Sequence, residues 1–251
     1  MANRYFIELA YDGTEYHGWQ IQPNAKSIQE TLNKALSTVL RSDVYTVGCG
    51  RTDTGVHATQ FFAHFELEEQ PGKLEDLCYR SNQVLPKDIA LKRIFSVEGE
   101  AHARFSASSR TYHYLIDSSK NAFQWNRAWE MRDSISLEAM NQAAKKLLEF
   151  QDFTSFSKSN TQTETNLCDV SHAEWTPTGT GYKFEIKANR FLRNMVRAIV
   201  GTLIDVGRGK LDQGQFEDII KSKNRSEAGL SVPAHGLYLM DVEYPKGILN
   251  E

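Results

Sequence analysis

The chain has 251 residues, of which 40% are hydrophobic and 24% are charged, and these values exclude collagen-like, mucin-like and disordered proteins. A chain of this length buries enough apolar surface for a stable core, in one large domain or in two smaller ones. Its 29 basic and 32 acidic residues leave a formal net charge of −3, which argues against a generic nucleic-acid coat protein and favours an enzyme with a small substrate.

The first half of the chain predicts secondary-structure elements in the order β-α-β-β-α-β. Ser27 and Glu30 have the spacing of a helix capping box, and Pro86 is expected to end the second helix. Runs rich in aromatic and aliphatic side chains predict the strands. The predicted elements are strands at 4–11, 44–49, 57–67 and 88–97 and helices at 27–41 and 73–85.

The second half nearly repeats this order, as β-α-β-β-α-α-β. Tyr112, Tyr114 and Ile116 alternate as expected for a strand, and Ser136 is placed to cap a helix with one apolar face. Gly207 is expected to end a second, strongly apolar helix. The predicted elements are strands at 110–117, 166–175, 182–188 and 236–244 and helices at 136–150, 191–206 and 212–221.

Both halves match the split β-α-β pattern, so the predicted fold class is α+β, with two tandem ferredoxin-like (RRM-like) modules and antiparallel sheets. We expect an N-terminal module over residues 1–104 and a C-terminal module over residues 105–251. The two modules share an order of elements but no obvious sequence. Two such modules facing each other would leave a cleft between their sheets.

The sequence carries no recognised cofactor or metal signature. GCG at 48–50 begins like a dinucleotide-binding loop, but Asp53 stands where that motif requires glycine, and GK at 209–210 lacks the other P-loop residues. The seven histidines have no metal-ligand spacing, so we predict neither a metal nor a cofactor. Three cysteines without a CxxC pair indicate reduced thiols, and no signal peptide or membrane-spanning run is apparent, which together predict a cytoplasmic location.

The most unusual segment is GCGRTDTGVHA, residues 48–58, in which two glycines bracket the polar run from Arg51 to Thr54. One interpretation is a plain turn in which Asp53 accepts hydrogen bonds from nearby amides. The other is a carboxylate held at a strand end as a nucleophile, beside an arginine that can pair with it or with phosphate. A carboxylate suits this task because it is ionised at neutral pH without a neighbouring base.

A second segment, ANRFLRNMVRAIVG at residues 188–201, places Arg190, Arg193 and Arg197 at helical spacing among apolar residues. An amphipathic helix with a solvated arginine face is the ordinary interpretation. Arg197, however, is surrounded by valine, alanine and isoleucine, so we expect partial burial and a carboxylate or phosphate partner. Residues 183–210 hold seven Lys or Arg against two Asp or Glu, which concentrates positive charge in an otherwise acidic protein.

Three further segments are unusual. YDGTEYHGWQIQP at 11–23 combines aromatic rings with amide groups, a mixture that suits base stacking as well as a structured loop. FSASSRTYHYLI at 105–116 places Tyr112 and Tyr114 on one strand face beside Arg110, although core tyrosines are the ordinary explanation. RSEAGLSVPAHGLYL at 225–239 predicts a loop, punctuated by glycine and proline, that leads into the last strand.

Taken together, these segments closely resemble those of the TruA family of tRNA pseudouridine synthases. The match is colinear and covers essentially the whole chain, through YDGTEYHGWQIQP, GRTDTGVHA, SRTYHY, FLRNMVRAIVG and SEAGLSVPAHGLYL. The resemblance implies a two-module fold and conversion of uridine to pseudouridine at positions 38 to 40 of the tRNA anticodon stem-loop, with no cofactor. It also implies that the partners are the anticodon arm of tRNA and a second copy of the chain, in a homodimer.

The same resemblance implies roles for the residues that match the family's motifs. Asp53 would be the catalytic aspartate, and Arg51 would help to extrude the target base. Tyr112 would stack on the base, with a part in proton transfer left open, and Arg197 would form an ion pair with Asp53. The other residues expected to bind the substrate are Arg110, Arg190 and Arg193.

Two positions depart from the family's pattern: Thr54 stands where alanine is usual, and His17 lies at a less constrained position. The implied reaction is an isomerisation, which needs no redox partner and no group donor. Asp53 could attack C1′ of the ribose, assist elimination to a glycal, or add to C6 of the base. Tyr112 and Asp53 are both candidates for the base that removes the C5 proton.

Two other function classes compete with this one. A non-catalytic RNA-binding protein built from two RRM-like modules would leave the uridine unchanged, and the RRM aromatic signature is missing from the predicted strands. A small-molecule enzyme on duplicated ferredoxin-like modules is favoured by the acidic net charge. Salt separates this last class from an RNA enzyme, because phosphate contacts make RNA affinity fall with salt.

Overall fold

The computed structural model describes residues 3–98, 100–158 and 164–249, and the fold is α+β, with nine strands and five α-helices in that part of the chain. The chain divides into two compact units, here called unit 1 (Met1–Ser108 with Leu239–Glu251) and unit 2 (Ser109–Tyr238). The predicted boundary at residues 104 and 105, the tandem ferredoxin-like architecture and the cleft stay predictions. None of the described helices is long and apolar enough to cross a membrane.

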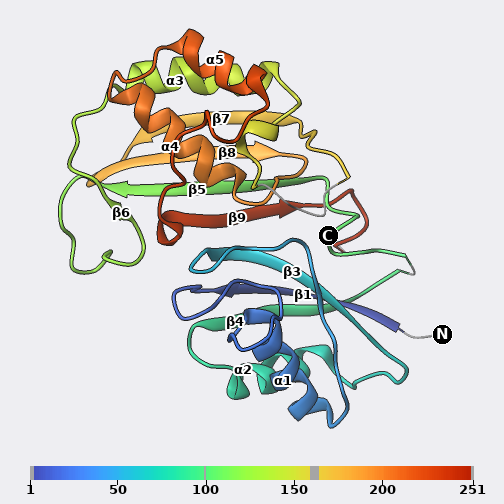
Figure 1. Cartoon of the computed structure of the whole chain (residues 1–251). Helices are drawn as coiled ribbons and strands as arrows, with labels where there is room; N and C mark the ends of the chain where they lie inside the picture. Colours follow the sequence, from blue (N-terminus) through green and yellow to red (C-terminus); the bar gives the residue numbers. More distant parts are fainter. Residues whose placement is uncertain (1–2, 99, 159–163, 250–251) are drawn as a thin grey trace. The chain divides into compact units, whose positions relative to one another are not determined.

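Unit 1 is built on antiparallel strands with two helices. It contains β1 (Asn3–Tyr11), β2 (Val47–Gly48), β3 (His57–Leu67), β4 (Ile89–Val97), α1 (Ile28–Leu40), α2 (Leu74–Val84) and most of β9 (Leu237–Glu243). The strand order is β4-β1-β3-β9, with β2 beside β3, and β1 is antiparallel to both β3 and β4. Both helices lie on the same face of these strands (Figure 1).

Successive side chains of a strand point to opposite sides, and β1 has buried side chains on both. Tyr5 and Ile7 are buried on one side. Phe6, on the other side, contacts the ring of Tyr244 with the centroids 5.7 Å apart. Tyr244 Oη in turn donates a hydrogen bond to Ala103 O at 2.6 Å, which ties the residue after β9 to the segment that follows β4.

Helix α1 begins where the sequence predicts. Ser27 Oγ accepts a hydrogen bond from Glu30 N at 3.2 Å, whereas the Glu30 carboxylate binds Lys34 Nζ at 2.6 Å instead of completing a capping box. Leu32 and Leu36 are fully buried on the apolar face of the helix. Each such side chain contributes roughly 2 kcal/mol to stability through its burial.

The strand predicted at 44–49 is wrong in extent, because it is reduced to the two residues of β2. Val44 N donates to Ser37 Oγ at 2.9 Å, and Thr46 N donates to Asn33 Oδ1 at 3.0 Å. Both acceptors are side chains of α1. These two backbone amides therefore donate to side chains of α1 and are not available to pair with β3.

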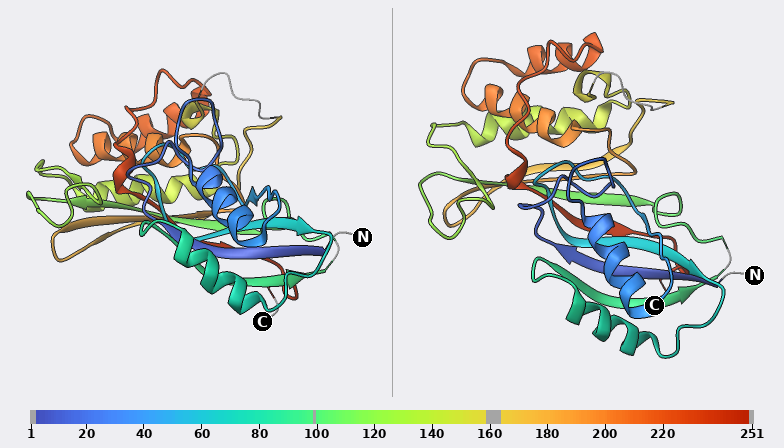
Figure 2. Two further views of the ribbon diagram at one scale, coloured as in Figure 1. Left: turned by 90° about the horizontal axis from the view of Figure 1, so that it is seen from below. Right: turned by 60° about the horizontal axis from the view of Figure 1, so that its bottom comes forward.

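Unit 2 has three long strands covered by three helices. It contains β5 (Ser109–Asp117), β6 (Trp129–Glu130), β7 (Val170–Pro177), β8 (Gly181–Ala188), α3 (Leu137–Lys146), α4 (Met195–Gly207) and α5 (Gln213–Ser222). β8 lies between β5 and β7 and is antiparallel to both. The short β6 runs parallel to β5, so the strands are mixed and the prediction of antiparallel sheets is wrong at this pair. The three helices lie together on one side of the strands in each view (Figures 1 and 2).

Helix α4 begins at Met195, four residues later than the sequence predicts. Asn194 has a left-handed backbone with a φ of +68°, which interrupts the helical path, and its side-chain amide donates to Ser231 Oγ at 2.6 Å. Arg193 therefore precedes the helix, as Arg190 does, and the interpretation in which these arginines share a helical face with Arg197 is wrong.

Candidate functional site

Asp53 lies in unit 1, in the irregular loop that joins β2 to β3. The side chain is half-buried, and Thr52 next to it is buried. Val56 N donates to Asp53 O at 3.2 Å, which closes a turn around the aspartate. Thr52 Oγ1 lies 2.9 Å from Tyr11 Oη, a hydrogen bond that fixes the loop to the end of β1. The carboxylate is therefore presented from a short loop that is held on both sides.

The segment at 11–19 supports this loop. Trp19 N donates to Thr52 O at 3.3 Å, and Gly55 N donates to Tyr16 O at 3.2 Å. Gly18 has a φ of +82°, and a Cβ there would lie 2.2 Å from Thr52 O, so only glycine permits this close approach. Tyr16 and Trp19 are each 1% exposed, so these rings belong to the core and not to a surface for base stacking.

Tyr112 lies on β5 of unit 2 and is half-buried. Its ring packs edge-on against Phe191, with the centroids 5.1 Å apart, which connects β5 to the turn before α4. Tyr114, two residues further on, is fully buried, and its hydroxyl donates to Pro233 O at 2.8 Å. Of the two tyrosines that the sequence places on one face, Tyr112 is the one with surface to offer a substrate.

Arg197 lies in the first turn of α4 and is half-buried, as its apolar neighbours in the sequence predict. Its Nε donates to Val232 O at 2.8 Å, and Val232 N donates to Arg197 O at 3.2 Å. Gly201, one turn later, lies against the same loop, because a Cβ there would be 1.8 Å from Leu230 O. The arginine is thus oriented by the loop that precedes β9.

The other predicted arginines of unit 2 lie around the same region. Arg110 Nη1 donates to Asn189 O at 2.8 Å, which joins β5 to the residue before Arg190. Arg190 is half-buried near Cys168: burial raises the pKa of that thiol to about 11, while the charge of Arg190 acts in the opposite direction. Arg193 is exposed.

Positive charge is concentrated at the turn before α4. Further along, Arg208 pairs with Asp133 and with Asp205, and Lys210 lies 3.3 Å from Asp205, so these cations are balanced locally. The sequence from residue 186 to residue 204 has no acidic residue and contains Lys187, Arg190, Arg193 and Arg197.

One residue in this region is not among the sequence-based candidates. Leu230 is 88% exposed although it is large and apolar, and it lies in the loop that holds Arg197. The sequence offers a signal for this residue, a leucine between Gly229 and Ser231 in a polar loop.

Arg51 is exposed in the loop that carries Asp53. The ion pair between Asp53 and Arg197 stays a prediction.

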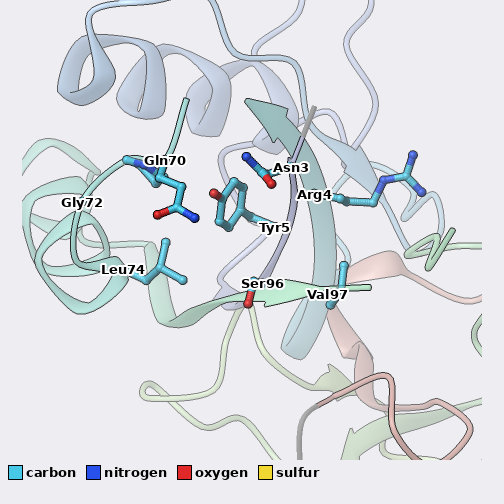
Figure 3. A pocket seen from close by; sticks show the side chains of 9 residues that line it. Asn3, Arg4, Tyr5, Gln70, Gly72, Leu74, Ser96 and Val97 are labelled. Atoms are coloured by element: carbon cyan, nitrogen blue, oxygen red, sulfur yellow. The ribbon is translucent and has the colours of Figure 1, made fainter. Parts of the chain in front are cut away.

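Unit 1 also has a pocket of about 280 Å³ at the N-terminal end of β1 (Figure 3). Asn3, Tyr5 and Gln70 are among its lining residues. The Arg4 side chain points away from it and donates to Glu66 Oε1 at 3.1 Å. None of the predicted site residues lines this pocket. Among the residues that the structure describes, no group of three or more His, Cys, Asp or Glu could hold a metal ion.

Comparison with known proteins places these features in a family. The tRNA pseudouridine synthase family model matches residues 143–245. The chain is 51% identical over 251 residues to tRNA pseudouridine synthase A of Bacteroides thetaiotaomicron, covering 99% of this chain and 93% of that protein. It is 50% identical over 248 residues to the protein of that name from Porphyromonas gingivalis, covering 98% of each chain.

A more distant relative gives the same result. The chain is 40% identical over 242 residues to tRNA pseudouridine synthase A of Ruminiclostridium cellulolyticum, covering 95% of this chain and 98% of that one. Identities of this size over nearly whole chains show a shared family and a shared fold. The chain belongs to the TruA family of tRNA pseudouridine synthases, which are isomerases.

Proposed function

We propose that the protein converts uridine to pseudouridine at positions 38 to 40 of the tRNA anticodon stem-loop, with Asp53 as the catalytic nucleophile. The observation that carries the proposal is the 51% identity, over 99% of the chain, to a protein named tRNA pseudouridine synthase A. The proposal is further supported by the half-buried Asp53 side chain, because its loop is held to β1 by the hydrogen bond between Thr52 and Tyr11. We also propose that the two units follow the tandem ferredoxin-like architecture and that the enzyme acts in the cytoplasm.

The reaction rearranges bonds within one nucleotide. The N1–C1′ bond breaks, a C5–C1′ bond forms, and the proton lost from C5 is balanced by the proton gained at N1. No electron acceptor or group donor enters, so carboxylate, guanidinium and phenol groups suffice. The target uridine has to leave the base stack before these groups can reach it.

Each candidate residue has a part in this scheme. Asp53 is the nucleophile that attacks the nucleotide. Arg197 pairs with that carboxylate and stabilises the charge that develops on the detached base. Tyr112, with its ring supported by Phe191, stacks on the uracil. Arg51 extends from the loop of the aspartate and helps to hold the base out of the helix. Arg110, Arg190 and Arg193 contact the RNA backbone near the reacting uridine.

Substitution of Asp53 tests the proposal. The hydrogen bond from Val56 N is accepted by the backbone carbonyl of Asp53. Asp53→Asn therefore preserves this bond and removes only the charge of the side chain. We expect Asp53→Asn and Asp53→Ala to lower turnover by at least about 1,000-fold. The assay maps pseudouridine in anticodon stem-loop transcripts that carry one uridine each, at position 38, 39 or 40. Undiminished conversion by either variant would refute the role of Asp53.

The oligomeric state forms a separate part of the proposal. In one copy, the segment from Lys187 to Arg197 is a run of four cations without acidic residues. We propose a homodimer in which the two copies of this segment contribute to one positive groove for the anticodon arm. Light scattering should give twice the mass of one chain. A fully active monomer would contradict this part and leave the proposed reaction intact.

A further inference from the structure

Two large aromatic side chains are exposed in unit 2, in a segment that contains none of the predicted site residues. Phe123 is 87% exposed and Trp125 is 74% exposed. Both lie in the segment SSKNAFQWNRA, residues 118–128, which connects β5 to β6 and is here called the aromatic loop. Rings of this size are mostly buried in folded proteins, and an exposed pair therefore points to a binding surface.

The aromatic loop has a defined conformation. Phe123 N donates to Asn121 Oδ1 at 3.0 Å, and Ala128 N donates to Gln124 O at 3.1 Å. At the end of the loop, Tyr238 Oη donates to Arg127 O at 2.7 Å. The rings are thus presented from a folded loop, so a ligand meets them without a large cost in ordering the backbone.

The chemical surroundings of the rings indicate the type of ligand. Lys120 and Arg127 flank the rings and are exposed, and the sequence from residue 118 to residue 129 contains no acidic residue. Asparagine and glutamine side chains alternate with the aromatic residues in the segment KNAFQWNR. Aromatic faces for stacking, cations for phosphates and amides for base edges are the groups that bind unpaired RNA.

We propose that the aromatic loop is a second RNA-binding element, in which Phe123 and Trp125 stack on unpaired bases and Lys120 and Arg127 contact phosphates. This inference rests on the proposed function, because tRNA is the RNA concerned. Five residues of β5 separate Tyr112 from the start of the loop, a span of about 17 Å at the rise of a strand. The loop therefore contacts nucleotides other than the reacting uridine, and it contributes to substrate affinity and not to the chemical step.

Steady-state kinetics and binding to a full-length tRNA transcript test the proposal. We expect Phe123→Ala and Trp125→Ala each to raise Kd and KM by about tenfold with kcat unchanged. Trp125→Phe retains an aromatic face and should stay close to the wild type. Tyr79→Ala is the matched control, because Tyr79 is an aromatic residue that is 67% exposed on α2 of unit 1, outside the aromatic loop.

Salt dependence tests the two cations. Each phosphate contact contributes about 0.7 to 0.9 to the slope of log Kd against log salt. We expect Lys120→Ala and Arg127→Ala each to lower this slope by about that amount. An unchanged slope in both variants would contradict their contact with phosphate.

The fluorescence of Trp125 gives a direct readout. Trp19 and Trp175 are each 1% exposed and Trp129 is half-buried, so iodide reaches Trp125 most readily among the four tryptophans. Addition of tRNA should protect the emission of the wild type from iodide, and this protection should vanish in Trp125→Phe. Full iodide quenching in the presence of saturating tRNA would overturn the proposal.

Three further outcomes are distinguishable. If Phe123→Ala and Trp125→Ala lower the mass in light scattering at the concentrations used for binding, the loop covers a second copy of the chain and the RNA assignment is overturned. If the wild type forms pseudouridine while the variants bind tRNA as tightly as it does, this inference fails alone. If the variants lose affinity but the wild type forms no pseudouridine, the proposed reaction fails and the RNA-binding loop stands.

Discussion

At the scale of single residues, three kinds of contact hold the candidate catalytic groups. The backbone of Asp53 is fixed in a turn, the ring of Tyr112 is supported by Phe191, and the guanidinium of Arg197 is tied to the carbonyl of Val232. Asp53 is held by its backbone and Tyr112 by its ring, so a substitution that changes only the carboxylate or the hydroxyl leaves these supports in place.

Tyr112→Phe separates stacking from proton transfer. The ring and its contact with Phe191 are retained and the hydroxyl is lost. If the hydroxyl assists removal of the C5 proton, turnover should fall by about 100-fold while RNA affinity is unchanged. Measurement of kcat and Kd on one anticodon stem-loop decides this, and a variant with wild-type kcat would leave Tyr112 with stacking alone.

His64 makes the stability of the protein depend on pH. It is buried between Phe6 and His102, and its Nδ1 accepts a hydrogen bond from Ala103 N at 3.1 Å. Burial, together with the charges of His102 and Arg4, lowers the pKa of His64 to about 4. An unfolded histidine has a pKa of about 6.5, so the unfolded state binds more protons between these values. Stability should therefore fall as the pH falls from about 6.5 to 4, by up to about 3 kcal/mol.

Urea unfolding of the wild type and of His64→Gln between pH 7 and pH 5 checks this prediction. Glutamine retains an acceptor for Ala103 N but cannot be protonated in this range. The free energy of unfolding should decline less with acid in the variant than in the wild type. Equal declines in the two proteins would show that His64 does not contribute to the pH dependence.

At the scale of elements, the sequence predicts most helices and strands because local signals decide them. Ser27 caps α1 as expected, and Asp212 with Gln215 forms a complete capping box at α5. The misses have tertiary causes. β2 is short because side chains of α1 bind the amides before it, and α4 begins late because Asn194 adopts a left-handed backbone and binds Ser231. Neither partner is visible from local periodicity.

The candidate site shows the same division. Asp53 and Arg197 could be selected from the sequence because a charged residue between glycines, or among apolar residues, is unusual. The supports could not be predicted, since Gly18 beside Thr52 and Gly201 beside Leu230 bring together segments far apart in the chain. Family resemblance supplied the roles, which depend on the substrate and not on the protein alone.

Gly201→Ala tests the packing of α4 against the loop before β9. The added Cβ would lie 1.8 Å from Leu230 O, a backbone atom, so the loop must move. The bond from Arg197 Nε to Val232 O should be disturbed, and stability should fall by about 2 kcal/mol. Ala198→Gly, on the same helix, is the control, because it removes a buried methyl group and weakens the helix, by about 2 kcal/mol together, without a clash. We expect Gly201→Ala to lose more turnover than this control, and equal turnover would show that the loop position is unimportant.

At the scale of the whole molecule, unit 1 is made of two pieces of chain that are 130 residues apart in sequence, on either side of unit 2. β9 lies next to β3, and Val242 N donates to Gln60 Oε1 at 3.0 Å. Tyr244 packs edge-on against Phe6 and Phe62, with centroids 5.7 and 5.2 Å away. The unit that carries Asp53 therefore depends on residues from both parts of the chain.

Substitution of Tyr244 tests this dependence. Tyr244→Ala removes both ring contacts and should destabilise unit 1 by about 3 to 4 kcal/mol. Tyr244→Phe retains the ring and loses the hydrogen bond to Ala103 O, which should cost about 1 kcal/mol. Urea unfolding, with hydrogen exchange of β1 and β3 as a local readout, measures both effects. Similar losses in the two variants would show that the ring contacts contribute little.

The return of the chain to unit 1 also sets an order of events during synthesis. Residues 3–108 leave the ribosome long before β9, so β3 lacks its neighbour and the ring of Phe6 lacks Tyr244 while unit 2 is being made. Unit 2, by contrast, is continuous in sequence and can fold as soon as it has emerged. A ribosome that stops before β9 thus releases a chain in which unit 2 can fold but the unit that carries Asp53 lacks its last strand.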